Sequence, residues 1–182
     1  MKTNQSFLAA LVGIFAFAMT AVSCKNNEPV VPNPYTGPKP VSAYIIYGFT
    51  PDAESMAKLD FFMDYYDQNG EVQTVKLPAT PWEQKVEAAL PAKFGQRLRI
   101  ALKDGVTVAD DEKVPINYAF KYETCSLRED GTKACDEYKI EDNVISQSHG
   151  DKFKKRLEDP VLRAVVCKYD AEGKLSVIKA WE

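Results

Sequence analysis

Apolar and polar side chains alternate along most of the chain after Val41. This period of two is typical of half-buried β-strands, whose successive side chains point to opposite faces of a sheet. The clearest example is the segment 97–103, in which Leu98, Ile100 and Leu102 alternate with arginine, alanine and lysine residues. We therefore expect eight short strands, within residues 41–49, 59–66, 72–77, 82–88, 97–103, 116–122, 161–169 and 175–181.

Turns that end in glycine separate several of these segments, as at 67–70 and 170–173. Glycine suits that position because it adopts positive φ without steric cost. Seven or eight short strands separated by turns predict an all-β fold, an antiparallel immunoglobulin-like sandwich. We expect at most one or two short helices, because an amphipathic helix fits 151–158 and a helical turn fits 51–56.

The N-terminus has a different pattern. Lys2 is followed by the run 7–19, which contains 13 residues and no charged or polar side chain. A membrane-spanning helix needs about 20 residues, so this run matches the apolar part of a secretory signal peptide. It leads to Ala21-Val22-Ser23-Cys24, which resembles the lipobox of bacterial lipoproteins. Ala21 stands where that family usually carries leucine.

The resemblance implies that Cys24 carries lipid. In lipoproteins of this kind the cysteine is diacylated, the peptide bond before it is cut, and the new amine is often acylated too. Two or three acyl chains anchor a protein stably, whereas one chain is marginal. Residues 1–23 are then the signal peptide. Residues 24–40 form the acylated cysteine and a stalk, since five prolines lie between positions 29 and 40. The sandwich domain is expected to occupy 41–182.

A second resemblance lies within the domain. The segment Tyr66–Gly70, followed by Leu77-Pro78 and Trp82, resembles a pattern in small MmpS-like envelope proteins. Those proteins place a tyrosine–turn–glycine strand pair before a Leu-Pro-Trp sequence, whereas here residues 79–81 separate the proline from the tryptophan. The resemblance implies a small sandwich that assists a larger membrane complex and has no catalytic role.

Two cysteines flank a predicted hairpin. Glu129-Asp130-Gly131 fits a three-residue loop with glycine in the left-handed position, which sets Cys125 opposite Cys135 at a non-hydrogen-bonded site. Because an exported protein meets oxidising conditions, we expect a disulfide between these two cysteines, with pairing to Cys167 left open. The same register predicts four further cross-strand pairs: Tyr122–Tyr138, Phe120–Ile140, Glu123–Glu137 and Lys121–Lys139.

The amino-acid composition limits which partners, metal sites and catalytic sites this chain can have. A chain of 182 residues suits one domain with a targeting segment, and a net charge of −3 leaves no basic excess for nucleic acid. His149 is the only histidine, which excludes a histidine-cluster metal site, and we predict no metal or cofactor. Ser146, Ser148 and Asp151 lie beside it on one polar loop, where neighbouring side chains rarely reach triad geometry. We therefore assign no catalytic residue.

One surface feature predicts a binding site. The outward-facing residues of the strands 41–49 and 59–66 combine rings and carboxylates: Tyr44, Ile46, Asp60, Phe62, Asp64 and Tyr66. If the two strands pair, these residues form one aromatic–acidic patch, which suits stacking on sugar rings and hydrogen bonds from their hydroxyls, or a protein interface. Alternatively, the 123–139 hairpin or the segment 143–160 covers this face.

These features together predict a lipid-anchored protein of the cell envelope, in the outer membrane at its periplasmic face or at the cell surface. We expect a non-enzymatic accessory or binding module. Its partners are then the membrane, through the lipid anchor, and an envelope protein. The first alternative is a glycan-binding lipoprotein that uses the aromatic–acidic patch. The second is a small hydrolase or inhibitor.

Overall fold

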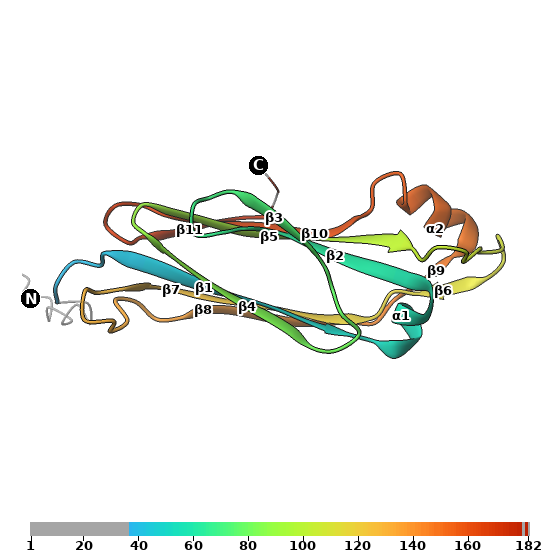
Figure 1. Ribbon diagram of the computed structural model, residues 1–182, viewed down its shortest axis with the longest axis horizontal. Helices are drawn as coiled ribbons and strands as arrows, with labels where there is room; N and C mark the ends of the chain where they lie inside the picture. The colour runs from blue at the N-terminus through green and yellow to red at the C-terminus, as the bar shows by residue number, and fades with distance from the viewer. Residues whose placement is uncertain (1–36, 180, 182) are drawn as a thin grey trace, which may run out of the picture. The chain divides into compact units, whose positions relative to one another are not determined.

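Two antiparallel sheets pack face to face in the part of the chain that the computed structural model describes, residues 37–179 and 181 (Figure 1). These residues belong to one unit, which begins at Pro34. The signal segment 1–23, Cys24 and the stalk up to residue 36 lie outside the described residues. The predicted fold class, an all-β antiparallel sandwich with two short helices, is confirmed.

The four-stranded sheet has the order β4-β1-β7-β8, and the five-stranded sheet has the order β11-β10-β5-β2-β3. Their strands are β1 (Ser42–Pro51), β2 (Leu59–Tyr66), β3 (Val72–Lys76), β4 (Trp82–Ala89), β5 (Ala92–Leu102), β7 (Tyr118–Leu127), β8 (Tyr138–Val144), β10 (Val161–Tyr169) and β11 (Leu175–Ile178). A third sheet pairs β6 (Lys113–Pro115) with β9 (Gln147–His149). The eight predicted strands are present, β8 corresponds to the second strand of the predicted hairpin, and β6 and β9 are additional.

The core lies between the two large sheets because every second side chain of each strand points inward. Tyr47 and Phe49 of β1 are buried there, as are Phe61 and Met63 of β2. The ring of Phe49 lies 5.2 Å from the ring of Phe61 in the opposite sheet and 6.0 Å from that of Tyr118. The inner faces are therefore mostly apolar, with Gln96 and Thr124 as polar side chains fully buried between the sheets.

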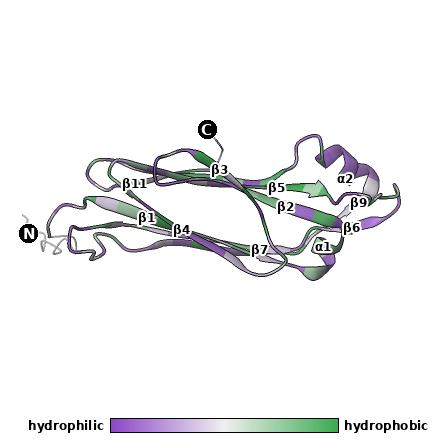
Figure 2. Cartoon of the chain, in the orientation of Figure 1, coloured by the Kyte–Doolittle hydropathy of each residue, from purple (hydrophilic) through white to green (hydrophobic). Residues whose placement is uncertain are grey.

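Two short helices lie near the predicted positions. α1 (Ala53–Lys58) begins after Asp52, whose carboxylate accepts a 3.0 Å hydrogen bond from the Ser55 amide and caps the helix. α2 (Gly150–Arg156) is mostly hydrophilic (Figure 2), but Phe153 is fully buried and holds it against the domain. Gly150 permits a close approach, since a Cβ there would lie 1.9 Å from the carbonyl oxygen of Ala109.

The hairpin loop 129–131 has the predicted form. The amide of Arg128 donates to the carbonyl of Thr132 at 2.9 Å, and Gly131 has a φ of 78°. Leu127 is bridged to Lys133, which is the register that the sequence predicts next to the loop.

Farther from the loop the predicted register is wrong by two residues. Tyr122 lies opposite Ile140 and Phe120 opposite Asp142, so the predicted pairs Tyr122–Tyr138 and Phe120–Ile140 are not formed directly across the strands. The predicted like-charge pairs are also replaced: the structure sets Glu123 opposite Lys139 and Lys121 opposite Glu141. A shift of two residues keeps every side chain on its face, and opposite charges across an antiparallel pair are favourable. The irregular segment 134–137 accommodates the shift.

Of the predicted stalk, only residues 37–40 are described. The carbonyl of Pro38 accepts a hydrogen bond of 3.2 Å from Arg128 Nε, so this last part of the stalk lies against the hairpin. β1 begins two residues after Pro40. Among the described residues, neither helix has the length and apolar character needed to cross a membrane.

Replacing Phe61 with alanine should lower the free energy of unfolding by about 3–5 kcal/mol, because the change leaves a cavity between the sheets. Denaturant unfolding followed by circular dichroism measures this effect. Val72→Ala is the control: Val72 is 50% exposed, so its loss should change stability by about 0.5 kcal/mol or less. Equal effects of the two substitutions would contradict the arrangement of the core.

Candidate functional site

The single aromatic–acidic patch predicted from the sequence is not formed. β1 pairs with β4 and β7, whereas β2 pairs with β3 and β5, so the two strands lie in different sheets. Tyr44 and Ile46 are therefore on the outer side of the four-stranded sheet. The other predicted residues, Asp60, Phe62, Asp64 and Tyr66, are on the outer side of the five-stranded sheet. The structure thus divides the predicted site between opposite faces of the sandwich.

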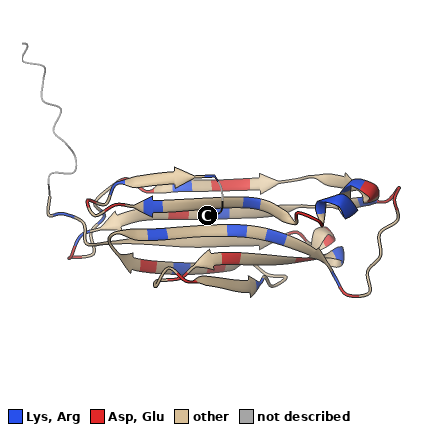
Figure 3. Ribbon diagram, turned by 90° about the horizontal axis from the view of Figure 1, so that it is seen from above, with Lys and Arg blue, Asp and Glu red and all other residues tan. Residues whose placement is uncertain are grey.

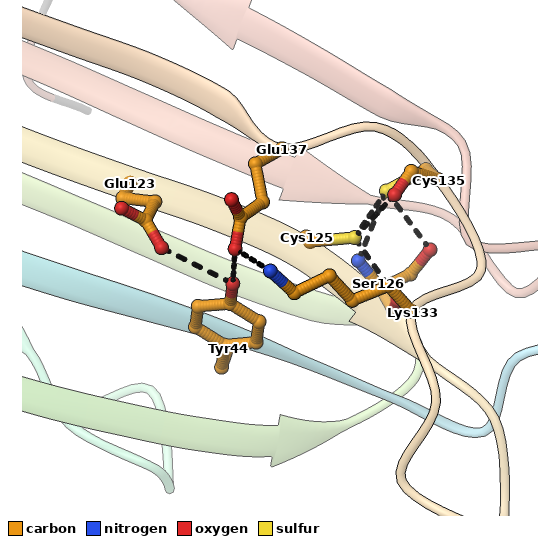
Figure 4. Close-up of polar contacts among 7 residues, drawn as sticks. All are labelled: Tyr44, Glu123, Cys125, Ser126, Lys133, Cys135 and Glu137. Carbon is orange, nitrogen blue, oxygen red and sulfur yellow. Dashed lines mark hydrogen bonds and ion pairs between the residues drawn. The ribbon is translucent and has the colours of Figure 1, made fainter.

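Tyr44 is covered by the irregular end of the β7–β8 hairpin (Figure 4). Its ring is only 5% exposed, and its hydroxyl lies 2.6 Å from a carboxylate oxygen of Glu137 and 3.4 Å from one of Glu123. Burial, and then the hydrogen bond to Glu137, raise the pKa of the Tyr44 hydroxyl far above its ordinary value. The alternative expectation, that the 123–139 hairpin covers this face, is confirmed for Tyr44. Its ring is unavailable for stacking on a ligand.

The carboxylate that holds Tyr44 is itself held by a cation. Lys133 forms an ion pair with Glu137 four residues later in the chain. The hydrogen bond from Lys133, followed by that from Tyr44, lowers the pKa of Glu137 to about 2. The polar groups in this cluster already bind one another, which indicates a structural role in seating the hairpin.

Cys125 and Cys135 lie in the same region. Both are free cysteines in this structure, so the disulfide between them stays a prediction. Their sulfur atoms are 2.7 Å apart, and the amide of Ser126 donates to Cys135 Sγ at 3.3 Å (Figure 4). Burial is the main reason that the pKa of the Cys125 thiol rises to about 12, so an isolated thiolate is disfavoured here. Cys167 is fully buried in the core, and burial raises the pKa of its thiol to about 12 as well.

The outer face of the five-stranded sheet is organised around Asp64. This side chain is only 1% exposed and accepts hydrogen bonds from two arginines of β5 and a threonine of β3. Arg97 Nε donates to Asp64 Oδ2 at 2.8 Å, and Arg99 donates through Nε to Oδ2 at 2.7 Å and through Nη2 to Oδ1 at 2.6 Å. Thr74 Oγ1 donates to Oδ1 at 2.8 Å. One carboxylate therefore fixes two guanidinium groups.

Hydrogen bonds decide the ionisation of Asp64. Burial alone would raise the pKa of the carboxyl group, but the bonds from Arg99, Thr74 and Arg97 outweigh it and lower the pKa to about 2. Asp64 is consequently ionised at neutral pH, and its lone pairs are occupied. It cannot serve as the free acceptor of sugar hydroxyls that the predicted patch requires.

An aromatic stack lies beside the two arginines. Tyr66 lies over Gly95 of the neighbouring strand, where a Cβ atom would come within 3.0 Å of the tyrosine ring. Trp181 stacks on Tyr66 with 4.8 Å between ring centroids and 3° between their planes. The guanidinium of Arg97 lies 4.8 Å from the Trp181 ring, and Lys93 Nζ lies 4.3 Å from the Tyr66 ring. Such contacts between cations and ring faces are favourable.

The remaining predicted residues also lie next to cations. Lys76 Nζ is 2.6 Å from Asp60 Oδ2, and the guanidinium of Arg99 lies 5.8 Å from the Phe62 ring. Figure 3 views the molecule from the side of this sheet and shows Lys and Arg segments along its strands. The predicted β2 residues do share one face, but the cations of β5 convert it from an acidic to a basic–aromatic surface.

Several residues of this face are not apparent from the pattern of the sequence. Arg97 and Arg99 were predicted only as polar positions of a strand, although their spacing of two places both on one face. The register of β2 against β5 places both arginines on the same face as Asp64, because Asp64 lies opposite Arg97 and Phe62 lies opposite Arg99. Trp181 was predicted to end the last strand, but β11 ends at Ile178. No local pattern indicates that Trp181 stacks on Tyr66.

The loop with the residue types of a hydrolase triad has different hydrogen bonds. Ser146 Oγ donates to the carbonyl of Ile116 at 3.0 Å, and Ser148 Oγ donates to the carbonyl of His149 at 3.3 Å. Both hydroxyls therefore bind the backbone, and His149 is the residue that precedes α2. Neither contact resembles a nucleophile–base pair.

Replacing Asp64 with asparagine should lower the free energy of unfolding by about 3–5 kcal/mol at pH 7, because two arginines lose their shared partner. The carboxylate has a lower pKa in the folded protein than in the unfolded chain, so its stabilisation is present above about pH 4 and is lost as pH falls toward about 2. Unfolding at a series of pH values should show the difference between variant and wild type shrinking over that range. Asp60→Asn removes a single ion pair, to Lys76, whose side chain is 61% exposed, and should cost about 1 kcal/mol or less. A pH-independent difference for Asp64→Asn contradicts this account.

The cysteine pair gives a second expectation. Under oxidising conditions, non-reducing peptide mapping should link Cys125 to Cys135, and Cys135→Ser should lower the free energy of unfolding by about 2–3 kcal/mol. With a reductant present, the disulfide contribution should vanish from the wild type, and the two proteins should differ much less. A peptide that links Cys167 to either partner would show that this pairing is wrong.

Among residues 37–179 and 181, no three His, Cys, Asp or Glu side chains are grouped so that they could hold a metal ion. Comparisons of the chain with protein-family models, with curated proteins and with solved structures find no match.

Proposed function

We propose that this chain is a lipid-anchored, extracytoplasmic protein of the bacterial cell envelope whose sandwich acts as a non-enzymatic accessory or binding module. The apolar run 7–19 and the lipobox-like sequence that ends at Cys24 support the anchor. Acyl chains on Cys24 would hold the domain at a membrane surface. The outer membrane, at its periplasmic face or at the cell surface, is the proposed location.

The observation that carries the binding role is the arrangement of Arg97 and Arg99 around Asp64. A buried carboxylate orients two guanidinium groups on an outer sheet face, beside the ring of Phe62 and the stacked rings of Tyr66 and Trp181. Oriented cations next to ring faces suit recognition, since both are fixed before a ligand arrives. Asp64 is poorly suited to act as a general acid or base at neutral pH, because its hydrogen bonds lower the pKa of its carboxyl group to about 2.

The charge of this face favours an anionic partner over a neutral one. The outward-facing side chains of β2, β3 and β5 include four cations, Lys76, Lys93, Arg97 and Arg99, and two carboxylates, Asp60 and Asp64, both of which already bind cations. An envelope protein with an acidic surface and an acidic glycan both meet this requirement. The glycan alternative is therefore retained, on a basic–aromatic surface in place of the aromatic–acidic patch.

Fatty-acid labelling tests the anchor. Cells that express the full chain and are fed radioactive palmitate should yield a labelled protein in the membrane fraction. Cys24→Ala should abolish both the label and the membrane association. Cys135→Ser is the matched control, because it removes a cysteine outside the lipobox and should leave the label intact. An unlabelled wild-type protein, or equal labelling of Cys24→Ala, contradicts the proposed anchor.

A further inference from the structure

We propose that the outer face of the five-stranded sheet binds an acidic polysaccharide, whose carboxylates pair with Arg97, Arg99 and Lys93 while its sugar rings stack on Trp181 and Phe62. This inference rests on the proposed function and names the ligand class for the same surface, called here the basic–aromatic face. It is defined by Phe62, Asp64, Tyr66, Lys93, Arg97, Arg99 and Trp181.

The two arginines retain capacity for a ligand. Each uses its Nε and Nη2 groups on Asp64, and these bonds leave Nη1, with its two N–H donors, for another acceptor. The side chains of Arg97 and Arg99 are 30% and 31% exposed, so solvent and ligands reach them. Because Asp64 carries one negative charge, it balances only one of the two guanidinium groups. A ligand carboxylate would balance the other through bidentate hydrogen bonds.

Lys93 extends the cationic row along β5. It lies on the same face as Arg97, four residues away, and its ammonium group contacts the Tyr66 ring. Positions 93 and 97 on one strand are separated by about 13 Å. Cations at both ends of such a row suit a polymer with repeated acidic groups better than a small anion, which would contact one end only.

The rings provide the second half of the proposed recognition. Tyr66 is 5% exposed and forms the base of the stack, while Trp181 lies parallel above it and is half-buried. Phe62 is also half-buried and lies beside Arg99. Flat ring faces next to guanidinium groups contact the C–H face of a pyranose while the cations take its carboxylate. A neutral sugar would leave the surplus positive charge without a partner.

A membrane surface fits the same face less well. Electrostatic binding to anionic lipid uses clusters of about four to eight freely extended Lys or Arg side chains, whereas Arg97 and Arg99 are both held down by Asp64. Insertion into lipid also needs projecting apolar side chains. Among the described residues, the exposed large hydrophobic side chains are Val41, Val72 and Ile145, and of these Val72 alone, opposite Tyr66 on β3, lies on this face.

Calorimetric titration tests the proposal on the full lipidated chain in phosphatidylcholine nanodiscs. The probes are polygalacturonate, as an acidic polysaccharide, and pullulan, as a neutral one. Sedimentation of the same nanodiscs, which already hold the acyl chains, with phosphatidylglycerol vesicles tests whether this face binds an anionic membrane. We expect binding of polygalacturonate that weakens as salt increases, with none of pullulan or of the vesicles. Equal binding of pullulan, binding of the vesicles alone, or binding of none of the three overturns the proposal.

Variants locate the site. Arg97→Gln and Lys93→Gln should each weaken binding of polygalacturonate about tenfold, which is the effect of losing one charged hydrogen bond. The hydrogen bonds to Asp64 come from Arg97, Arg99 and Thr74 and do not involve Lys93. Lys93→Gln therefore remains informative if Arg97→Gln destabilises the fold. Lys139→Gln is the matched control, because Lys139 is 49% exposed on β8 of the opposite sheet. Equal losses for Lys93→Gln and Lys139→Gln indicate nonspecific attraction and overturn the proposal.

Trp181→Ala separates stacking from charge. It should weaken binding of polygalacturonate without changing its salt dependence, because no charged group is lost; an unchanged affinity contradicts the stacking half of the proposal. The anchor is tested independently by the palmitate label. A labelled chain that does not bind polygalacturonate disproves the ligand class alone, whereas a binding chain without label disproves the anchor alone.

Discussion

The outer face of the five-stranded sheet depends on one buried carboxylate. Asp64 is almost inaccessible to solvent, and an unpaired charge in that position would be strongly unfavourable. Its bonds to Arg97, Arg99 and Thr74 compensate for the lost hydration and connect β2 to both neighbouring strands. The same bonds restrict two long side chains that would otherwise be mobile. The interaction that makes Asp64 tolerable in the sheet is therefore also the one that fixes the cations of the proposed binding surface.

The two outer faces of the sandwich use polar side chains differently. On the four-stranded sheet, Tyr44, Glu137 and Lys133 bind one another and seat the end of the hairpin over β1. On the five-stranded sheet, the arginines bind Asp64 through Nε and Nη2, and these bonds do not use their Nη1 donors. Because the side chains of the inner faces are buried between the sheets, recognition has to use an outer face or an end of the domain. The hairpin covers part of one outer face, which leaves the basic–aromatic face as the better-equipped surface.

Local pattern predicted the elements of this fold but not their partners. Alternation identified the strands, and the glycine at position 131 identified the hairpin loop, because both depend on neighbouring residues. The pairing of β1 with β4 and β7 depends on contacts distant in sequence, and α1 carries the chain from one sheet to the other before β2 begins. The hairpin register was wrong by two residues because a loop alone does not fix pairing beyond an irregular segment. Charge favours the observed register, which sets Glu123 opposite Lys139.

The difference between local patterns and contacts distant in sequence also explains why the candidate site was predicted only in part. The β2 residues were assigned to the correct common face, since that follows from a period of two. The charge of this face was not predicted correctly, because it depends on which strand pairs with β2. Next to β1, Asp64 would have remained an acceptor for hydroxyl groups; next to β5, it is saturated by two arginines and the face attracts anions. The class of ligand that an outer sheet face attracts thus depends on residues of the neighbouring strands. The composition of one strand does not reveal which residues those are.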